Sequence, residues 1–155
     1  MKLNIVAVGQ RQPAWADQAV REFLDRLPAD FAVGLREVKP EPRDGKPVER
    51  ILAAEAERLR AACPTGTLVV ALDEHGKDWT TLQLAEKLRL WRDEAQDVAF
   101  VIGGPDGLAD EFKRSARLLL RLSSMTLPHA LARVLLAEQL YRAWSVSSNH
   151  PYHRA

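Results

Sequence analysis

The chain has 155 residues, a formal net charge of +1 and 28% charged residues, and 46% of its residues are hydrophobic. These values fit one domain over residues 1–155 with a sizeable core, and they exclude a disordered polar chain. No apolar run approaches the roughly 18 residues of a membrane span, so we expect no membrane contact. The single cysteine, Cys63, cannot form an internal disulfide and is expected to be a packed residue, which predicts a cytoplasmic protein.

Hydrophobic spacing predicts alternating strands and helices along the first half of the chain. The predicted strands are 3–9, 31–38 and 67–73, and the predicted helices are 14–27 and 48–62. The segment 39–47 holds three prolines and five charged residues, which is typical of a mobile surface loop. The strand 67–73 is apolar almost to its end at Asp73, as expected of a strand that is covered on both faces.

The second half continues this alternation. A turn at 74–79 precedes a helix that Thr80 or Thr81 can cap, and a strand at 97–103 precedes a turn at 104–107. A short basic helix near 109–117, a strand at 118–124 and a long helix from Pro128 to about Ser145 complete the pattern. Five successive strand–helix units predict the α/β class, with a mostly parallel sheet and helices on both faces.

Charge is distributed unevenly along the chain. Residues 112–155 contain seven lysines and arginines against one acidic residue, Glu138, whereas residues 1–111 carry an excess of acidic residues. The basic part suggests an anionic partner. The net charge is far below that of a protein that holds naked nucleic acid by charge alone. We therefore expect this partner to be recognised mainly by its shape, or to be presented as part of a larger assembly.

Ligands of parallel sheets bind at the carboxyl ends of the strands, so the loops after the predicted strands are candidate sites. In VIGGPDGL (101–108), Gly103 lacks a Cβ, so the backbone can lie against a flat ligand, although a tight turn without a ligand is the alternative. The first turn lacks the G-x-G-x-x-G pattern of dinucleotide-binding proteins. Asp73 resembles a phospho-acceptor, but the loop 9–12 has no carboxylate to hold magnesium, and the sequence shows no metal-ligand cluster.

The segment LSSMTLPH (122–129) is the most informative of these loops. Its hydroxyl side chains, Ser123, Ser124 and Thr126, are interleaved with the apolar side chains of Met125 and Leu127. Such an edge at the end of a buried strand suits a ligand with a polar purine and a sulfur-bearing chain. An ordinary capped loop is the alternative, and His129 by itself is more typical of a structural histidine than of a catalytic one.

The motifs VIGGPDGL, LSSMTLPHALARVLLAEQLYRAW and the terminal NHPYHR occur together in a chain of this length. In this combination the sequence closely resembles the RlmH family of bacterial ribosomal RNA methyltransferases, which are of the SPOUT class. The resemblance covers essentially the whole chain, and the block 122–154 is highly specific. It implies an α/β knot of the trefoil type, in which the C-terminal stretch is threaded through a loop. It also implies a homodimer, in which the tail of one subunit completes the site of the other.

The resemblance further implies S-adenosylmethionine as the cofactor, without a metal. The implied substrate is a pseudouridine in helix 69 of 23S rRNA, methylated at N3 on the assembled ribosome. The positions that match the family's cofactor site are Leu72, Gly103, Leu122, Ser123, Ser124, Met125, Thr126 and Leu127. Because the residue at Ser124 varies among members, its backbone is a firmer candidate than its side chain.

The last residues carry chemistry that this reaction can use. The acceptor N3–H must lose its proton, and negative charge develops on the flanking carbonyls. We expect Arg154 to stabilise that charge or to contact a phosphate, and His153 or His129 to accept or relay the proton. Tyr152 is expected to stack on the base or to hydrogen-bond to it. The alternative is that this tail only seals an interface.

Arg133 and Arg142 lie two to three turns apart on the predicted long helix, and both are expected to be available to RNA phosphates or to the partner subunit. Two other functions stay open on the residues alone. One is a non-catalytic module that binds ribosomes or RNA. The other is a different nucleotide-binding α/β enzyme, against which the missing glycine fingerprint argues.

Overall fold

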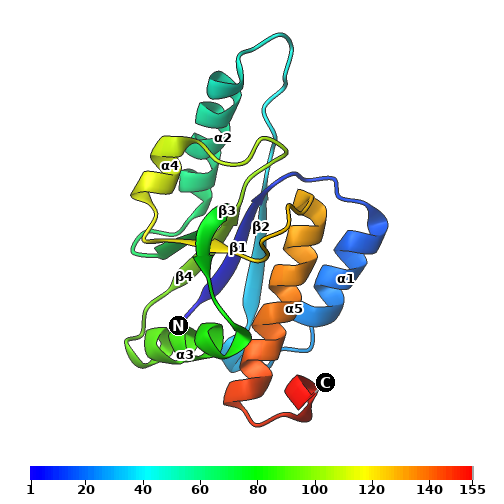
Figure 1. The fold of residues 1–155 in the computed structure, drawn as a ribbon, viewed down its shortest axis with the longest axis vertical. Coiled ribbons are helices and arrows are strands. Elements are labelled where there is room, and N and C mark those ends of the chain that lie inside the picture. Colours follow the sequence, from blue (N-terminus) through cyan, green and yellow to red (C-terminus); the bar gives the residue numbers. More distant parts are fainter. Residues whose placement is uncertain (155) are drawn as a thin grey trace.

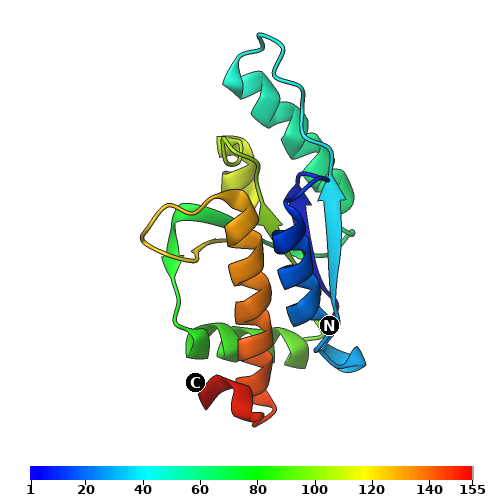
Figure 2. The same ribbon diagram turned by 90° about the vertical axis from the view of Figure 1, so that its right-hand side faces the viewer.

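The computed structural model describes residues 1–154 and has a five-stranded sheet at its centre (Figures 1 and 2). The strands are β1 (Leu3–Val8), β2 (Val33–Val38), β3 (Leu68–Asp78), β4 (Val98–Ile102) and β5 (Leu118–Arg121). Their order is β2-β1-β4-β3-β5, and every neighbouring pair is parallel. Parallel neighbours need a crossover connection, and the helices provide it.

Helices cover both faces of the sheet. They are α1 (Ala14–Leu24), α2 (Val48–Ala62), α3 (Thr81–Asp93), α4 (Asp110–Ser115) and α5 (His129–Ser147), with 3-10 turns η1 (Ala29–Phe31) and η2 (Pro151–Arg154). Ile5 of β1 packs in a core with α3 and α5, whereas its neighbour Val6 packs in a second core with α2 and α4. Successive side chains of a strand point to opposite faces, so β1 serves both cores. The predicted parallel α/β class with helices on both faces is confirmed, and the knot stays a prediction.

The predicted turn at 74–79 is wrong, because β3 continues to Asp78. Between Leu72 and Lys77 the register of β3 against β5 shifts, and Lys77 then pairs with Leu120. Gly76 lies so close to β5 that a Cβ at this position would be 2.6 Å from the backbone nitrogen of Leu120. The polar sequence here therefore marks an irregularity within the strand and not its end.

Capping residues and prolines mark the ends of several helices. Thr80 caps α3, where its hydroxyl accepts a hydrogen bond from the Gln83 N–H at 3.1 Å and its own N–H donates to the Gln83 side chain at 2.8 Å. This reciprocal pair satisfies two N–H groups that the first turn leaves without partners. α1 ends at Leu24, before the predicted 27, and Pro128 is the N-cap of α5. No helix among residues 1–154 is long and apolar enough to cross a membrane.

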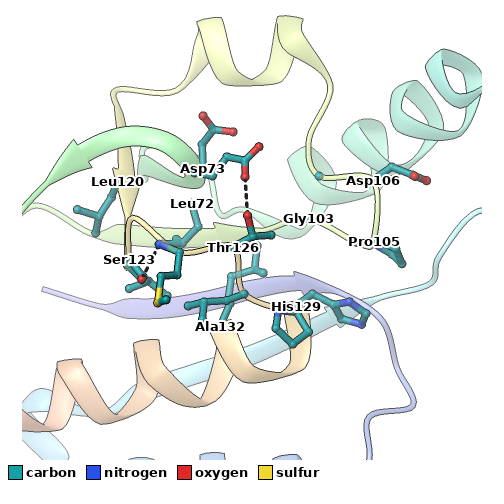
Figure 3. Close-up of a pocket in the computed structure, with 18 of the residues that line it drawn as sticks. Leu72, Asp73, Gly103, Pro105, Asp106, Leu120, Ser123, Thr126, His129 and Ala132 are labelled. Carbon is teal, nitrogen blue, oxygen red and sulfur yellow. Dashed lines mark hydrogen bonds between the residues drawn. The ribbon is translucent and has the colours of Figure 1, made fainter.

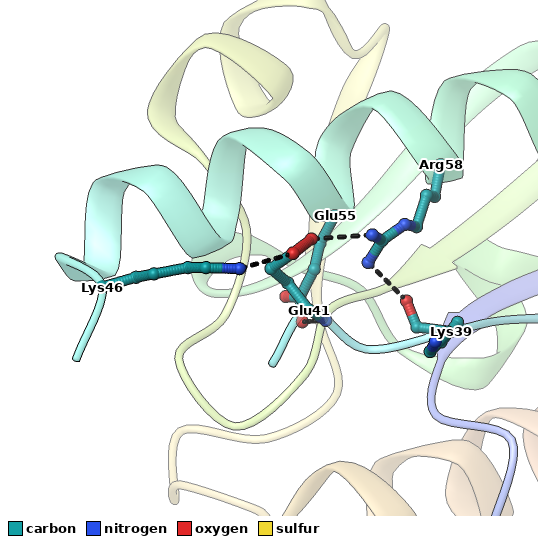
Figure 4. A network of polar contacts seen from close by, with 5 residues as sticks. All are labelled: Lys39, Glu41, Lys46, Glu55 and Arg58. Carbon is teal, nitrogen blue, oxygen red and sulfur yellow. Dashed lines mark hydrogen bonds and ion pairs between the residues drawn. The ribbon is translucent and has the colours of Figure 1, made fainter. Parts of the chain in front are cut away.

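The loop 39–47, predicted to be a mobile surface segment, makes charged contacts within itself and with α2 (Figure 4). The Glu41 carboxylate accepts hydrogen bonds from Lys46 at 2.9 Å and from Arg58 of α2 at 2.7 Å. The Glu41 N–H donates to Glu55, whose pKa is raised because its carboxyl is buried. Composition cannot distinguish such paired charges from solvated ones, since pairing depends on where α2 packs.

Candidate functional site

A pocket of about 630 Å³ opens at the carboxyl ends of β4 and β5, beside the point where β3 becomes irregular (Figure 3). Its wall is formed by segments that are far apart in the sequence, 72–74 of β3, 102–107 after β4 and 122–129 between β5 and α5. This is the edge of a parallel sheet at which ligands bind, and the volume lies in the range of small-molecule sites.

The glycine turn after β4 forms one wall of this pocket. The Gly107 N–H donates to the Gly104 carbonyl at 3.0 Å, and Gly107 has a φ of +81°, a conformation that favours glycine. A Cβ at Gly103 would lie 2.4 Å from the carbonyl oxygen of Gly107. A side chain at position 103 is therefore excluded by the turn itself, and the turn presents backbone to the pocket.

Replacing Gly103 with alanine is expected to lower the free energy of unfolding by about 1–3 kcal/mol, because the new methyl group must displace backbone. Gly34→Ala in the edge strand β2 is the matched control, since a Cβ there would approach only the movable side-chain oxygen of Asn4, at 2.5 Å. Urea denaturation of both variants measures the difference. Equal losses at the two positions would contradict this steric account.

The segment 123–127 leaves most of its backbone polar groups free. Across this fully described stretch, the only hydrogen bond of the main chain joins the Met125 N–H to the Ser123 hydroxyl, at 2.9 Å. The Thr126 hydroxyl donates to Glu74 at 3.3 Å and so ties the segment to β3. Free N–H and C=O groups on the wall of a pocket need partners, and a polar ligand can supply them.

The structure brings most of the candidate cofactor residues together. Those that line the pocket are Leu72, Gly103, Leu122, Ser123, Met125, Thr126 and Leu127. Ser124 is exposed and does not line it. The leucines give the pocket apolar walls, while the Met125 side chain is 76% exposed and lies at the rim of the single chain.

Sequence reasoning missed the charged groups around this pocket. Lys113 of α4 lies 3.1 Å from the Asp73 carboxylate, and the Asp106 carboxylate accepts a hydrogen bond from Arg43 at 2.6 Å. Among the described residues, Lys113 is the only lysine or arginine that lines the pocket. The position of Asp73 at the end of an apolar stretch was the one signal in the sequence, because its partner is set by the packing of α4.

His129, the first residue of α5, lines the pocket from the other side. Burial lowers the pKa of His129, and the positive charge of Arg133 one turn along the helix lowers it further. The imidazole is therefore neutral at neutral pH, and a neutral imidazole can accept a proton.

Arg133 is not available to RNA or to a partner subunit, which corrects the expectation. Its side chain is 1% exposed, and it makes an ion pair with Glu37 at the end of β2. The same guanidinium donates to the backbone carbonyls of Val8 at 3.3 Å and Gly9 at 3.2 Å. It thus joins α5 to the ends of β1 and β2, which is a structural role.

The tail is folded back on the C-terminal end of α5. The Tyr152 ring meets the Tyr141 ring edge-on with centroids 4.6 Å apart, and its hydroxyl donates to Glu138 at 3.2 Å. Burial and the Glu138 charge raise the pKa of Tyr152, so this phenol stays protonated at neutral pH. The Nδ1 atom of His153 is buried with no hydrogen-bond partner among residues 1–154. A buried polar atom without a partner is costly, so this packing leaves His153 unsatisfied.

The tail lies far from the pocket of its own chain (Figures 1 and 2). The pocket is at the start of α5 and η2 packs at its end, and a helix of 19 residues is about 28 Å long. Of the four candidate catalytic residues, His129 lines the pocket, and Tyr152, His153 and Arg154 do not. In the part of the chain described, no group of three or more His, Cys, Asp or Glu side chains could hold a metal ion.

Comparisons with known proteins agree along the whole chain. A family model described as a predicted SPOUT methyltransferase matches residues 1–153. Relatives from Burkholderia mallei (strain SAVP1) and Burkholderia pseudomallei (strain K96243) are each 57% identical over 156 residues, with 100% of both chains aligned. Both relatives bear the name ribosomal RNA large subunit methyltransferase H.

Solved structures share the fold at lower identity. A probable methyltransferase from Bordetella pertussis Tohama I has a TM-score of 0.59 and 21% identity, covering 92% of this chain and 95% of the other. A probable methylase family protein from Haemophilus influenzae Rd KW20 has a TM-score of 0.56 and 17% identity, covering 97% of this chain and 69% of the other. At these identities the likeness concerns the fold alone.

Proposed function

Because the chain belongs to the RlmH family of SPOUT methyltransferases, we propose that it is a methyltransferase of the large ribosomal subunit RNA. In this proposal it transfers the methyl group of S-adenosylmethionine to N3 of a pseudouridine in helix 69 of 23S rRNA, on the assembled ribosome. The observation that supports this most is the meeting of the glycine turn 103–107 with the segment 122–127 in one pocket, with His129 at its edge. The same proposal covers residues 1–155 as one methyltransferase domain in the cytoplasm.

The residues of the pocket fit S-adenosylmethionine. The free backbone groups of 123–127 can bind the edges of a purine, and the leucine side chains can contact its faces and the apolar chain. At Gly103 the wall is bare backbone, which allows close approach. When bound, the cofactor supplies a methyl group already activated on a sulfonium, so the protein mainly positions the reactants.

His129 is the proposed proton acceptor, because it is the one of the two candidate bases, His129 and His153, that lines the pocket. Its lowered pKa keeps the imidazole neutral at the pH of the cell, so it can take the N3 proton directly or through a water. The tail of a second copy would supply the remaining groups. Arg154 would donate hydrogen bonds to the charge that develops on the base carbonyls, and Tyr152 would stack or donate.

A homodimer is part of this proposal for a geometric reason. About 28 Å of α5 separates a tail from its own pocket, so the two can act together only between subunits. The buried Nδ1 atom of His153 lacks a partner among residues 1–154 of its own chain, and a new packing environment can provide one.

The pH dependence of methyl transfer is expected to reflect His129. The pKa of this group is lowered from the ordinary value of about 6.5, so the rate should stay constant above neutral pH and fall only as the pH drops below that value. Measuring kcat on ribosomes from pH 5 to 9 tests this. His129→Gln should lower kcat by roughly 10²–10⁴ and remove the acid limb, while His153→Gln should keep it. An acid limb that survives in His129→Gln would exclude His129 as the base.

The activity itself is tested with ribosomes from cells that lack the enzyme. Transfer of labelled methyl groups from S-adenosylmethionine, with the modified nucleotide mapped by mass spectrometry, is the expected result. Two other outcomes would point to the alternative functions. Ribosome binding without label would indicate a non-catalytic module, and calorimetric binding of NAD instead of S-adenosylmethionine would indicate another nucleotide-binding enzyme.

A further inference from the structure

A second groove, of about 1,210 Å³, is lined by the start of β3 and of β5, by Lys77 and Trp79 at the far end of β3, and by α3. It is separate from the pocket at the carboxyl ends, with which it shares no lining residue. Neither the candidate cofactor site nor the tail uses it.

The charged residues of this groove favour an anionic ligand. Three basic side chains, Lys77, Lys87 and Arg117, line it against a single carboxylate, Glu94. The three come from β3, from α3 and from the residue before β5, so they surround the groove and do not follow one helix face. All three residues are exposed, and within residues 1–154 none of them forms an ion pair.

Two of the neighbouring basic residues, by contrast, are paired with carboxylates. On α3, Arg89 pairs with Glu86 at 2.7 Å and with Asp93 at 2.8 Å. On β5, Arg121 pairs with Asp78 at 3.1 Å. These guanidinium groups are neutralised locally, whereas the ammonium and guanidinium groups that face the groove keep their charge available for a partner.

An aromatic surface lies among these charges. Trp79 is half-buried and packs against the buried Trp91, with ring centroids 6.4 Å apart. The Lys87 ammonium lies over the Trp79 ring, 6.0 Å from its centroid, and both residues line the groove, so a base that stacks on this ring takes the place of the ammonium. Nearby, the Thr67 hydroxyl oxygen is buried without a hydrogen-bond partner among the described residues. An indole with cations around it is a combination that binds a base and its phosphates.

The groove and the pocket are built on the same two strands. β3 carries Leu72 and Asp73 in the pocket and Lys77 beside the groove, and β5 carries Leu120 in the pocket and Leu118 in the groove. Leu118 and Leu120 are two residues apart, which is about 7 Å along a strand. A polynucleotide that places one nucleotide at the pocket can therefore reach the groove with a neighbouring one.

The geometry points to this groove as a binding site for single-stranded or looped RNA next to the methylated nucleotide. One unpaired base stacks on Trp79, and the flanking phosphates contact Lys77, Lys87 and Arg117. This inference rests on the proposed function, since it assigns where the RNA substrate is held outside the pocket. Stacking suits any base, so the groove contributes affinity and register more than sequence recognition.

The double variant Lys87→Gln/Arg117→Gln tests the groove without touching the pocket. Ribosomes from cells that lack the enzyme are the probe, and binding is measured by sedimentation at several salt concentrations. Loss of two phosphate contacts should raise the Kd roughly tenfold and reduce the slope of log K against log salt by about 1.5. The matched control is Arg92→Gln, an exposed position of α3 that does not line the groove, and it should leave both quantities unchanged.

Binding of S-adenosylmethionine, followed by calorimetry, should be the same in all of these proteins. A double variant that binds ribosomes as the control does would overturn the inference while leaving the proposed function intact. A wild-type protein that neither binds the cofactor nor methylates ribosomes would instead remove the proposed function. A photo-cross-linker on a cysteine introduced at position 87 should label RNA within a few nucleotides of the modified site, and labelling of a ribosomal protein in its place would also overturn the inference.

Discussion

Replacing Arg133 with alanine is expected to lower the free energy of unfolding by about 3–5 kcal/mol, because it removes a buried guanidinium that serves three acceptors at once. The side chain is 1% exposed and serves the Glu37 carboxylate and the carbonyls of Val8 and Gly9 together. A domain of this size has a total stability of about 5–15 kcal/mol, so the loss would be a large part of it. Urea denaturation followed by circular dichroism measures the change.

Arg142→Ala on the same helix is the control for this prediction. Its side chain is 24% exposed, pairs with Glu138 four residues away and lies over the Tyr152 ring at 4.8 Å, so its removal should cost about 1–2 kcal/mol. In a double-mutant cycle, Glu37→Gln combined with Arg133→Ala should cost less than the sum of the two single changes. A loss below 1 kcal/mol for Arg133→Ala would show that the buried contacts contribute little.

Activity is expected to return when two inactive variants share one dimer. His129→Ala disables a pocket and Arg154→Ala disables a tail, and each homodimer should lose about 10²-fold or more in kcat. In the heterodimer, one intact pocket meets the intact tail of the partner, so roughly half of the wild-type activity per dimer should reappear. The heterodimer is isolated with two affinity tags after co-expression, and methyl transfer to ribosomes is measured.

This experiment separates a tail that acts between subunits from one that acts within its chain. Pairing His129→Ala with His129→Gln gives the control heterodimer, which has no intact pocket and should stay inactive. If the first heterodimer is as inactive as its parents, the proposed composite site is wrong. Action of the tail on the pocket of its own subunit is already disfavoured, because pocket and tail lie at opposite ends of α5.

The excess of basic residues in the last third of the sequence does not correspond to a single RNA-binding surface. Of the seven basic residues after position 111, Arg133 is buried, and Lys113, Arg121 and Arg142 pair with carboxylates. Arg117 faces the second groove, and its neighbour in that groove, Lys77, comes from a stretch that was predicted to be a turn. Counting charges thus detected a basic region, but it could not tell which of its cations are available to a partner.

The sequence by itself determined the alternation of strands and helices, the parallel sheet and the two loops that form the pocket. These features depend on periodicity, on glycine and proline, and on caps such as Thr80, which act over a few residues. The tertiary structure alone decided the strand order, the continuation of β3 past Asp73, the burial of Arg133 and the pairing of Lys113 with Asp73. Each of these joins residues far apart in the chain, and which groups meet depends on how helices pack on the sheet, which no local pattern records.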